Sequence, residues 1–177
     1  MDAQKLFDDF CRQNRLEVTL SFEMPDGYET AYGTYDVTSN TLFFNLPMLD
    51  DAPEYEALFY LCHELRHAQQ YLYPQQFEQA VVESLPYVIL YNGTCFKLCG
   101  KEWKGCVLPG SEEYFSDVYL SLPYELDANA YAYRTVKFLL GESEALDKLY
   151  SMWLPKKRIS AEEYRKLFEQ VDVATEG

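Results

Sequence analysis

The only two histidines of this chain, His63 and His67, are four residues apart, and Glu64 directly follows the first. Residues at this separation are neighbours on one face of an α-helix, with Cβ atoms about 5–6 Å apart. A helix would therefore let both imidazoles reach one metal ion, while the carboxylate of Glu64 leaves in a neighbouring direction. The alternative is that both histidines are packing or surface residues of an ordinary amphipathic helix.

The surrounding segment, Pro53 to about Leu72, has the pattern of such a helix. Pro53 suits the first helical position, and Asp50 and Asp51 precede it as candidate caps. Small and apolar residues recur at helical spacing, which predicts a stripe that packs in the core. This stripe comprises Ala57, Leu58, Leu61, Cys62, Leu65 and Ala68. We expect the histidines on the adjacent face, at the floor of a cleft.

The spacing of these residues fits the chemistry of a catalytic zinc site. Such a site has three protein ligands and one open position for water. Zn²⁺ held by His63 and His67 would lower the pKa of that water from about 15.7 to about 7. Glu64 would then act as the general base that takes the proton from the water, and not as a ligand.

The third ligand must be an acid or a cysteine, because the chain has no third histidine. We predict Glu125, in the segment from Leu122 to Arg134, where Pro123 can open a helix. Asn129, one turn further along, could orient a ligand through a hydrogen bond. The alternatives for the third ligand are Asp127, Glu83 and Glu113.

Two segments together resemble a known group of enzymes. HELRH at 63–67 followed by ELDANAYA at 125–132 resembles the gluzincin metallopeptidases, and the second segment is most similar to the ImmA/IrrE-type peptidases. The resemblance implies a zincin-like fold, with His63, His67 and Glu125 as zinc ligands and Glu64 as general base. Arg66 departs from it, because many relatives carry glycine there.

The N-terminal part of the chain predicts strands and the remainder predicts helices. Alternating residues at Leu16–Phe22, Glu29–Tyr35 and Thr41–Leu46 predict a small antiparallel or mixed sheet of about three strands. We take Thr41–Leu46 as the candidate edge strand for pairing with a peptide substrate, the alternative being a plain core strand. Helices are expected at 3–13, 53–72, 75–90 with a break at Pro86, 112–121, 123–140, 142–153 and 160–171. With 177 residues, 48% of them hydrophobic, the chain predicts a single α+β domain over residues 1–177.

Composition limits the partners and the compartment. A net charge of −14 disfavours binding to nucleic acids and anionic lipids. We see no signal peptide and no apolar run of the roughly 18 residues that a membrane span needs. The five cysteines are odd in number, which predicts a reducing, cytoplasmic location. Cys95, Cys99 and Cys106 fit free thiols or one local disulfide better than a second metal site.

These observations predict a zinc-dependent metallopeptidase of the metalloendopeptidase type, acting on a peptide or protein substrate. A tyrosine near the metal could stabilise the oxyanion, and Tyr60, Tyr131 and Tyr133 are candidates, although each could equally be a packing residue. Two other functions remain open. One is a catalytically silent zincin-like protein that binds a partner protein, and the other is a small-molecule metallohydrolase.

Overall fold

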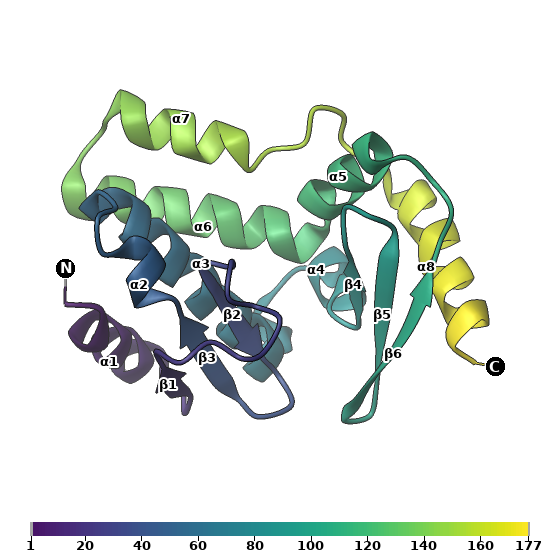
Figure 1. Cartoon of the computed structure of the whole chain (residues 1–177), viewed down its shortest axis with the longest axis horizontal. Helices are drawn as coiled ribbons and strands as arrows, with labels where there is room; N and C mark the ends of the chain where they lie inside the picture. Colours follow the sequence, from purple (N-terminus) through teal and green to yellow (C-terminus); the bar gives the residue numbers. More distant parts are fainter. Residues whose placement is uncertain (1, 177) are drawn as a thin grey trace. The chain divides into compact units, whose positions relative to one another are not determined.

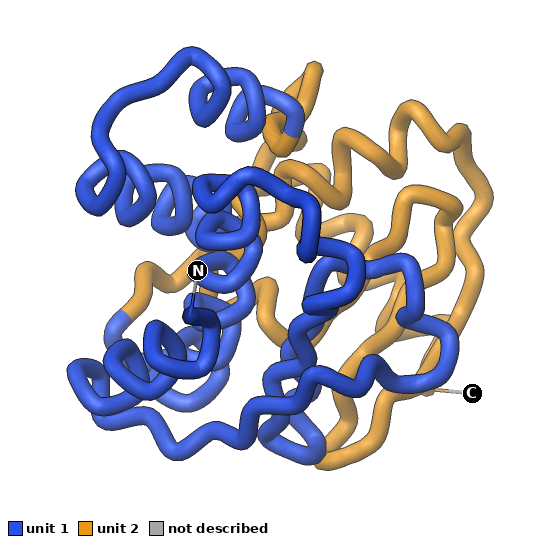
Figure 2. Tube along the Cα trace, turned by 60° about the vertical axis from the view of Figure 1, so that its left-hand side comes forward, with its two compact units in different colours: residues 1–76, 127–152 blue, residues 77–126, 153–177 orange. Residues whose placement is uncertain are grey.

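The computed structural model describes residues 2–176, which form eight α-helices and two three-stranded sheets (Figure 1). This confirms the predicted α+β class. No helix in this part of the chain is long and apolar enough to cross a membrane. The chain divides into two compact units, residues 1–76 with 127–152 and residues 77–126 with 153–177 (Figure 2). We call them unit 1 and unit 2, and the single domain over 1–177 stays a prediction.

The sheet of unit 1 has β3 (Thr41–Phe44) between β1 (Thr19–Ser21) and β2 (Gly33–Asp36). β3 is parallel to β1 and antiparallel to β2, so this is a small mixed sheet near the N-terminus, as the sequence predicts. The prediction that Thr41–Leu46 is an edge strand was wrong, because β3 has a partner on each side. Alternation shows which face of a strand is buried, but not how many strands flank it. β2 is the edge strand that packs on the long central helix of the unit, α3 (Glu54–Leu72).

The turn between β2 and β3 is organised by Asp36. Its Oδ1 accepts hydrogen bonds from the backbone nitrogen and Oγ1 of Thr38, at 2.8 and 2.7 Å, and its Oδ2 accepts one from Ser39 Oγ at 2.7 Å. Asn40 adopts a left-handed conformation with φ 51°, which asparagine tolerates better than most residues. These short polar residues therefore form the turn that connects the two strands.

α3 (Glu54–Leu72) contacts β2, β3 and α1 and is the centre of unit 1. Pro53 is its N-cap, one position before the place we expected, and no side chain caps the helix, so Asp50 and Asp51 do not have the predicted capping role. The predicted core stripe is confirmed, since all six of its residues are buried. The remaining elements that lie wholly in unit 1 are α1 (Ala3–Asn14), α2 (Leu46–Leu49), a 3₁₀ turn η1 (Pro74–Gln76) and α7 (Glu144–Met152).

α6 (Pro123–Leu140) begins at the predicted proline and continues without a break. Proline suits this position because the first N–H of a helix has no partner within the helix. The division between the units falls after the first turn of α6, and the rest of the helix belongs to unit 1. Because the helix is continuous, the side chains of its first turn are positioned by α6 itself.

Unit 2 contains a sheet that the sequence analysis missed. β5 (Thr94–Cys99) pairs antiparallel with β4 (Tyr87–Ile89) and β6 (Glu102–Val107). α8 (Ala161–Thr175) packs against β5 and β6. The predicted helix over 75–90 was wrong beyond Pro86, where β4 begins. Pro86 has no N–H with which to continue the helix, and its ring would collide with the preceding turn. The strands then pair with partners outside the segment that we considered. The helices of unit 2 are α4 (Gln79–Ser84), α5 (Glu112–Ser121) and α8 (Ala161–Thr175).

Candidate metal centre

His63 and His67 lie inside α3 and turn their imidazoles toward each other. Their ring centroids are 4.4 Å apart with planes at 88°, and their Nε2 atoms are 2.9 Å apart. His67 is buried and His63 is partly buried. The helical spacing therefore brings two potential ligand nitrogens to the same point, as two-point binding of a metal from one helix requires.

Glu125 supplies a third ligand atom from the first turn of α6. Glu125 is only 6% exposed, and buried carboxylates in proteins are generally paired or bound to a metal. The ligand atoms of His63, His67 and Glu125 all lie within 4.8 Å of one another. Two imidazole nitrogens and one carboxylate oxygen at these separations could hold a metal ion. The three residues predicted as ligands are thus the three that the fold brings together.

The alternatives for the third ligand lie outside this group. Glu83 on α4 and Glu113 on α5 are exposed, and neither belongs to a metal-holding cluster among residues 2–176. Asp127 is close to the histidine helix, but its two carboxylate oxygens accept hydrogen bonds from Arg66 and Gln70. Asp127 therefore connects α6 to α3 as a hydrogen-bond acceptor.

Gln70, one turn further along α3, contacts the ring nitrogen of His67 that does not face His63. The Nδ1 atom of His67 is 2.9 Å from Oε1 of Gln70, whose side chain is fully buried. The amide nitrogen of Gln70 donates to Oδ2 of Asp127, also at 2.9 Å. An outer hydrogen bond of this kind fixes the orientation of a ligating imidazole.

Glu64 lies against the edge strand β2. A Cβ atom added to Gly33 would be 2.8 Å from Glu64 Cγ and 3.1 Å from the carbonyl oxygen of Phe43, so a side chain at position 33 would collide with Glu64. Tyr32, which precedes Gly33, stacks on Tyr60 of α3 with ring centroids 4.0 Å apart. The start of β2 is therefore fixed to the part of α3 that carries Glu64.

All three tyrosines considered as oxyanion donors have other contacts, and that of Tyr60 is its stacking on Tyr32. Tyr133 donates its hydroxyl hydrogen to Asp147 Oδ1 at 2.6 Å. Tyr131 packs edge-on against Phe10, and the guanidinium of Arg66 lies 4.6 Å from its ring centroid. All three rings thus have structural roles.

All five cysteines are free thiols. Cys95 and Cys106 face each other across β5 and β6, but no group of cysteines within residues 2–176 could hold a metal. Burial raises the pKa of Cys62 to about 12, and burial together with the neighbouring Cys106 raises the pKa of Cys95 to about 12. These two thiols are therefore poor nucleophiles at neutral pH.

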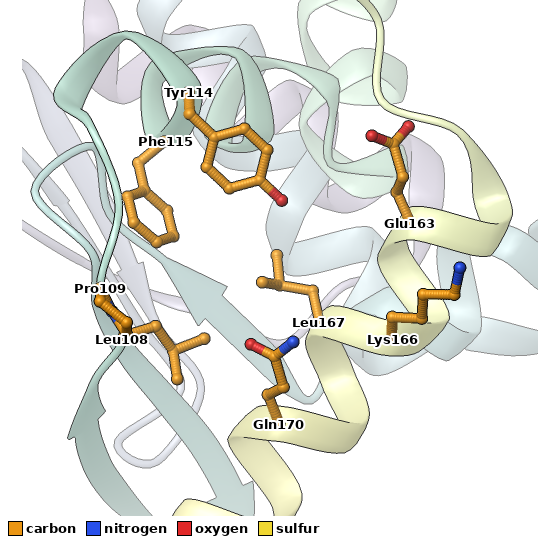
Figure 3. A pocket seen from close by; sticks show the side chains of 8 residues that line it. All are labelled: Leu108, Pro109, Tyr114, Phe115, Glu163, Lys166, Leu167 and Gln170. Carbon is orange, nitrogen blue, oxygen red and sulfur yellow. The ribbon is translucent and has the colours of Figure 1, made fainter.

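Unit 2 has a pocket of about 290 Å³ between the chain that follows β6 and helices α5 and α8 (Figure 3). Phe115 and Leu167 point apolar groups into it, while Glu163 and Lys166 stand at its side. The full lining is Leu108, Pro109, Tyr114, Phe115, Glu163, Lys166, Leu167 and Gln170. No predicted metal ligand lines this pocket.

Sequence reasoning missed three contributors to the site: the pairing of Arg66 with Asp127, the contact of Gln70 with His67, and the close approach of Gly33 to Glu64. Arg66, at a position where many of the resembling peptidases carry glycine, was a visible signal that an acidic partner was needed. The spacing of Gln70 from His67 was a second signal, since residues three apart on a helix are neighbours. Nothing in the local sequence pointed to Gly33.

Comparisons of the chain with protein-family models, curated proteins and solved structures found no match. The site therefore rests on the chain's own geometry. It consists of the ligand group His63, His67 and Glu125, with Glu64 next to the first histidine and the edge strand β2 against Glu64.

Proposed function

We propose that this protein is a zinc-dependent metallopeptidase in which His63, His67 and Glu125 hold the metal and Glu64 is the general base. The observation that carries the proposal is the convergence of the three ligand atoms within 4.8 Å of one another. Two imidazoles and one carboxylate are a ligand set of catalytic zinc sites, which keep a fourth position open for water. The resemblance of segments 63–67 and 125–132 to the gluzincins, and most of all to the ImmA/IrrE-type peptidases, supports the same assignment.

The bound metal and Glu64 would have different roles in the hydrolysis. Zinc, when bound, polarises the substrate carbonyl and lowers the pKa of a coordinated water. Glu64 accepts a proton from the attacking water and later donates it to the leaving amine. A metal that only stabilised the fold would not need a carboxylate at this position, so Glu64 favours hydrolysis over a silent binding protein.

A peptide substrate is favoured by the position of β2. As an edge strand, β2 has backbone N–H and C=O groups to which an extended peptide can pair. Gly33 begins this strand and lies against Glu64. A peptide that pairs with β2 would therefore run close to the general base.

The test is zinc content by elemental analysis, together with cleavage of an unfolded protein substrate followed by mass spectrometry. We expect about one zinc per wild-type chain and a sharp loss of zinc in Glu125→Gln. Glu64→Gln should keep the zinc and lose cleavage, and the exposed control Glu113→Gln should keep both. Absence of zinc after reconstitution would overturn the proposal, as would undiminished cleavage by Glu64→Gln, which would favour a different catalytic site.

A further inference from the structure

We infer that Gln70 is a positioning residue that, with Asp127, holds His67 in the tautomer whose proton is on Nδ1 and whose Nε2 is available to bind a metal. The inference rests on the proposed function, because it assigns to His67 the role of a zinc ligand. It adds that the two histidines are not equivalent before the metal binds: His67 is preorganised and His63 is not.

The tautomer follows from the hydrogen-bonding capacity of three side chains. An ionised carboxylate has only acceptors, so the group of Gln70 that lies 2.9 Å from Asp127 Oδ2 must be its NH₂. The carbonyl oxygen of Gln70 is then the atom that lies 2.9 Å from His67 Nδ1. A carbonyl oxygen can only accept, so Nδ1 must carry the proton. In a neutral imidazole this leaves a lone pair on Nε2.

Arg66 keeps Asp127 in the orientation that this chain of hydrogen bonds needs. Its Nε donates to Oδ2 at 2.7 Å and its Nη2 donates to Oδ1 at 3.1 Å, so the guanidinium binds both carboxylate oxygens. A two-point pair of this kind resists rotation of the carboxylate. Arg66 also donates from Nη1 to Gln69 Oε1 at 2.8 Å, which fixes the guanidinium itself.

The contact between the two histidines then assigns the proton of His63. The Nε2 atoms are 2.9 Å apart, a separation at which one nitrogen donates and the other accepts. Because Nε2 of His67 is the acceptor, Nε2 of His63 carries a proton in the metal-free protein. Binding of a metal through Nε2 therefore requires His63 to move its proton to Nδ1, whereas His67 binds through Nε2 without a change of tautomer.

The experiment uses the full chain and zinc alone as the ligand, with ¹⁵N-labelled imidazoles. Long-range ¹H–¹⁵N correlation spectra at about pH 8, where ordinary histidines are neutral, show which ring nitrogen carries the proton. Since the chain has only two histidines, a single variant at His63 assigns all the signals. In metal-free wild type we expect the proton on Nδ1 of His67 and on Nε2 of His63. Zinc should change the tautomer of His63 only.

The variant Gln70→Met removes the acceptor opposite His67 Nδ1 and keeps a side chain of similar length. We expect it to lose the Nδ1–H preference of His67 and to weaken zinc binding about 10- to 100-fold. The control is Gln4→Met, which makes the same substitution at an exposed amide of α1 and should leave both the tautomer and the zinc affinity unchanged.

The inference is overturned if metal-free wild-type His67 carries its proton on Nε2, or if Gln70→Met keeps the Nδ1–H form and wild-type zinc affinity. The wild-type tautomer is measured without Gln70→Met, so the test stands even if that variant fails to fold. A wild-type protein that binds no zinc would instead overturn the proposed function. In that case the metal-free spectra would still decide whether Gln70 sets the tautomer of His67.

Discussion

Arg66 and Asp127 form a two-point ion pair that joins α3 to α6, with N–O distances of 2.7 and 3.1 Å. Both side chains are mostly buried, at 18% and 22% exposure. Arg66 directly precedes the ligand candidate His67, and Asp127 comes two residues after Glu125. The pair therefore sets the separation of the two helices at the point where the candidate ligands meet.

This burial predicts strong coupling between Arg66 and Asp127 in a double-mutant cycle. We expect Arg66→Met and Asp127→Asn each to lower the free energy of unfolding, with a coupling energy of about 1–3 kcal/mol, because the bonds are charge-assisted and partly shielded from water. Urea unfolding of the wild type, the two single variants and the double variant at neutral pH measures the coupling energy. The exposed pair Glu162–Lys166 is the control, with an expected coupling of about 0.5 kcal/mol or less. Equal coupling in the two cycles would contradict a structural role for the Arg66 pair.

Gly33→Ala should impair the proposed catalysis without removing the metal. The added Cβ would lie 2.8 Å from Glu64 Cγ, so the Glu64 side chain must move from its place beside His63. We expect cleavage to fall at least about tenfold, since small misplacements of catalytic groups have effects of this size. Zinc content should be unchanged. The control is Gly105→Ala in β6, where the added Cβ would lie nearest to the Phe96 ring, at 3.2 and 3.3 Å, and activity should be retained. If Gly33→Ala cleaves at the wild-type rate, Glu64 is not held by this contact.

Asp36 should contribute stability that is lost in acid. Burial by itself would raise the pKa of Asp36, but hydrogen bonds from Ser39 and Thr38 outweigh burial and lower the pKa below its ordinary 3.8. A lowered pKa in the folded state stabilises the protein at pH values above the unfolded-state pKa. This contribution falls away as the pH drops through the folded-state pKa.

We therefore expect Asp36→Asn to cost about 1 kcal/mol at neutral pH, because the Oδ2 acceptor is replaced by a donor. The cost should shrink as the pH falls below about 4. Urea unfolding at several pH values measures the difference between variant and wild type, with the exposed Asp51→Asn as control. A cost that stays constant down to about pH 2 would show that Asp36 acts only through the shape of the turn.

The cysteines should differ in their reactivity toward iodoacetamide in the folded protein. Burial raises the pKa of Cys62 to about 12, so at about pH 8 only about one thiol in ten thousand is ionised. Cys95, with a pKa also raised to about 12, should react as slowly, while the partly exposed Cys99 and Cys106 should react first. Mass spectrometry of peptides over time measures the order, and the unfolded protein, in which all five should react alike, is the control. Early labelling of Cys62 would mean that α3 opens readily.

The sequence by itself determined the local elements and the identity of the candidate ligands. The helices at 112–121 and 123–140 have the predicted bounds, and Pro123 opens the second helix as expected. Helical spacing likewise placed His63 and His67 on one face of α3. These features depend on residues a few positions apart, whose geometry is set by the backbone period.

Only the tertiary structure decided the features that depend on residues far apart in the chain. Among these are the central place of β3, the sheet formed by β4, β5 and β6, and the approach of Gly33 to Glu64. Arg66 of the histidine motif pairs with Asp127 of the second motif. Gln70 contacts both Asp127 and His67 and so connects the pair to the histidine. Sequence spacing does not encode such pairings, because they arise when elements pack together and their buried polar groups must find partners.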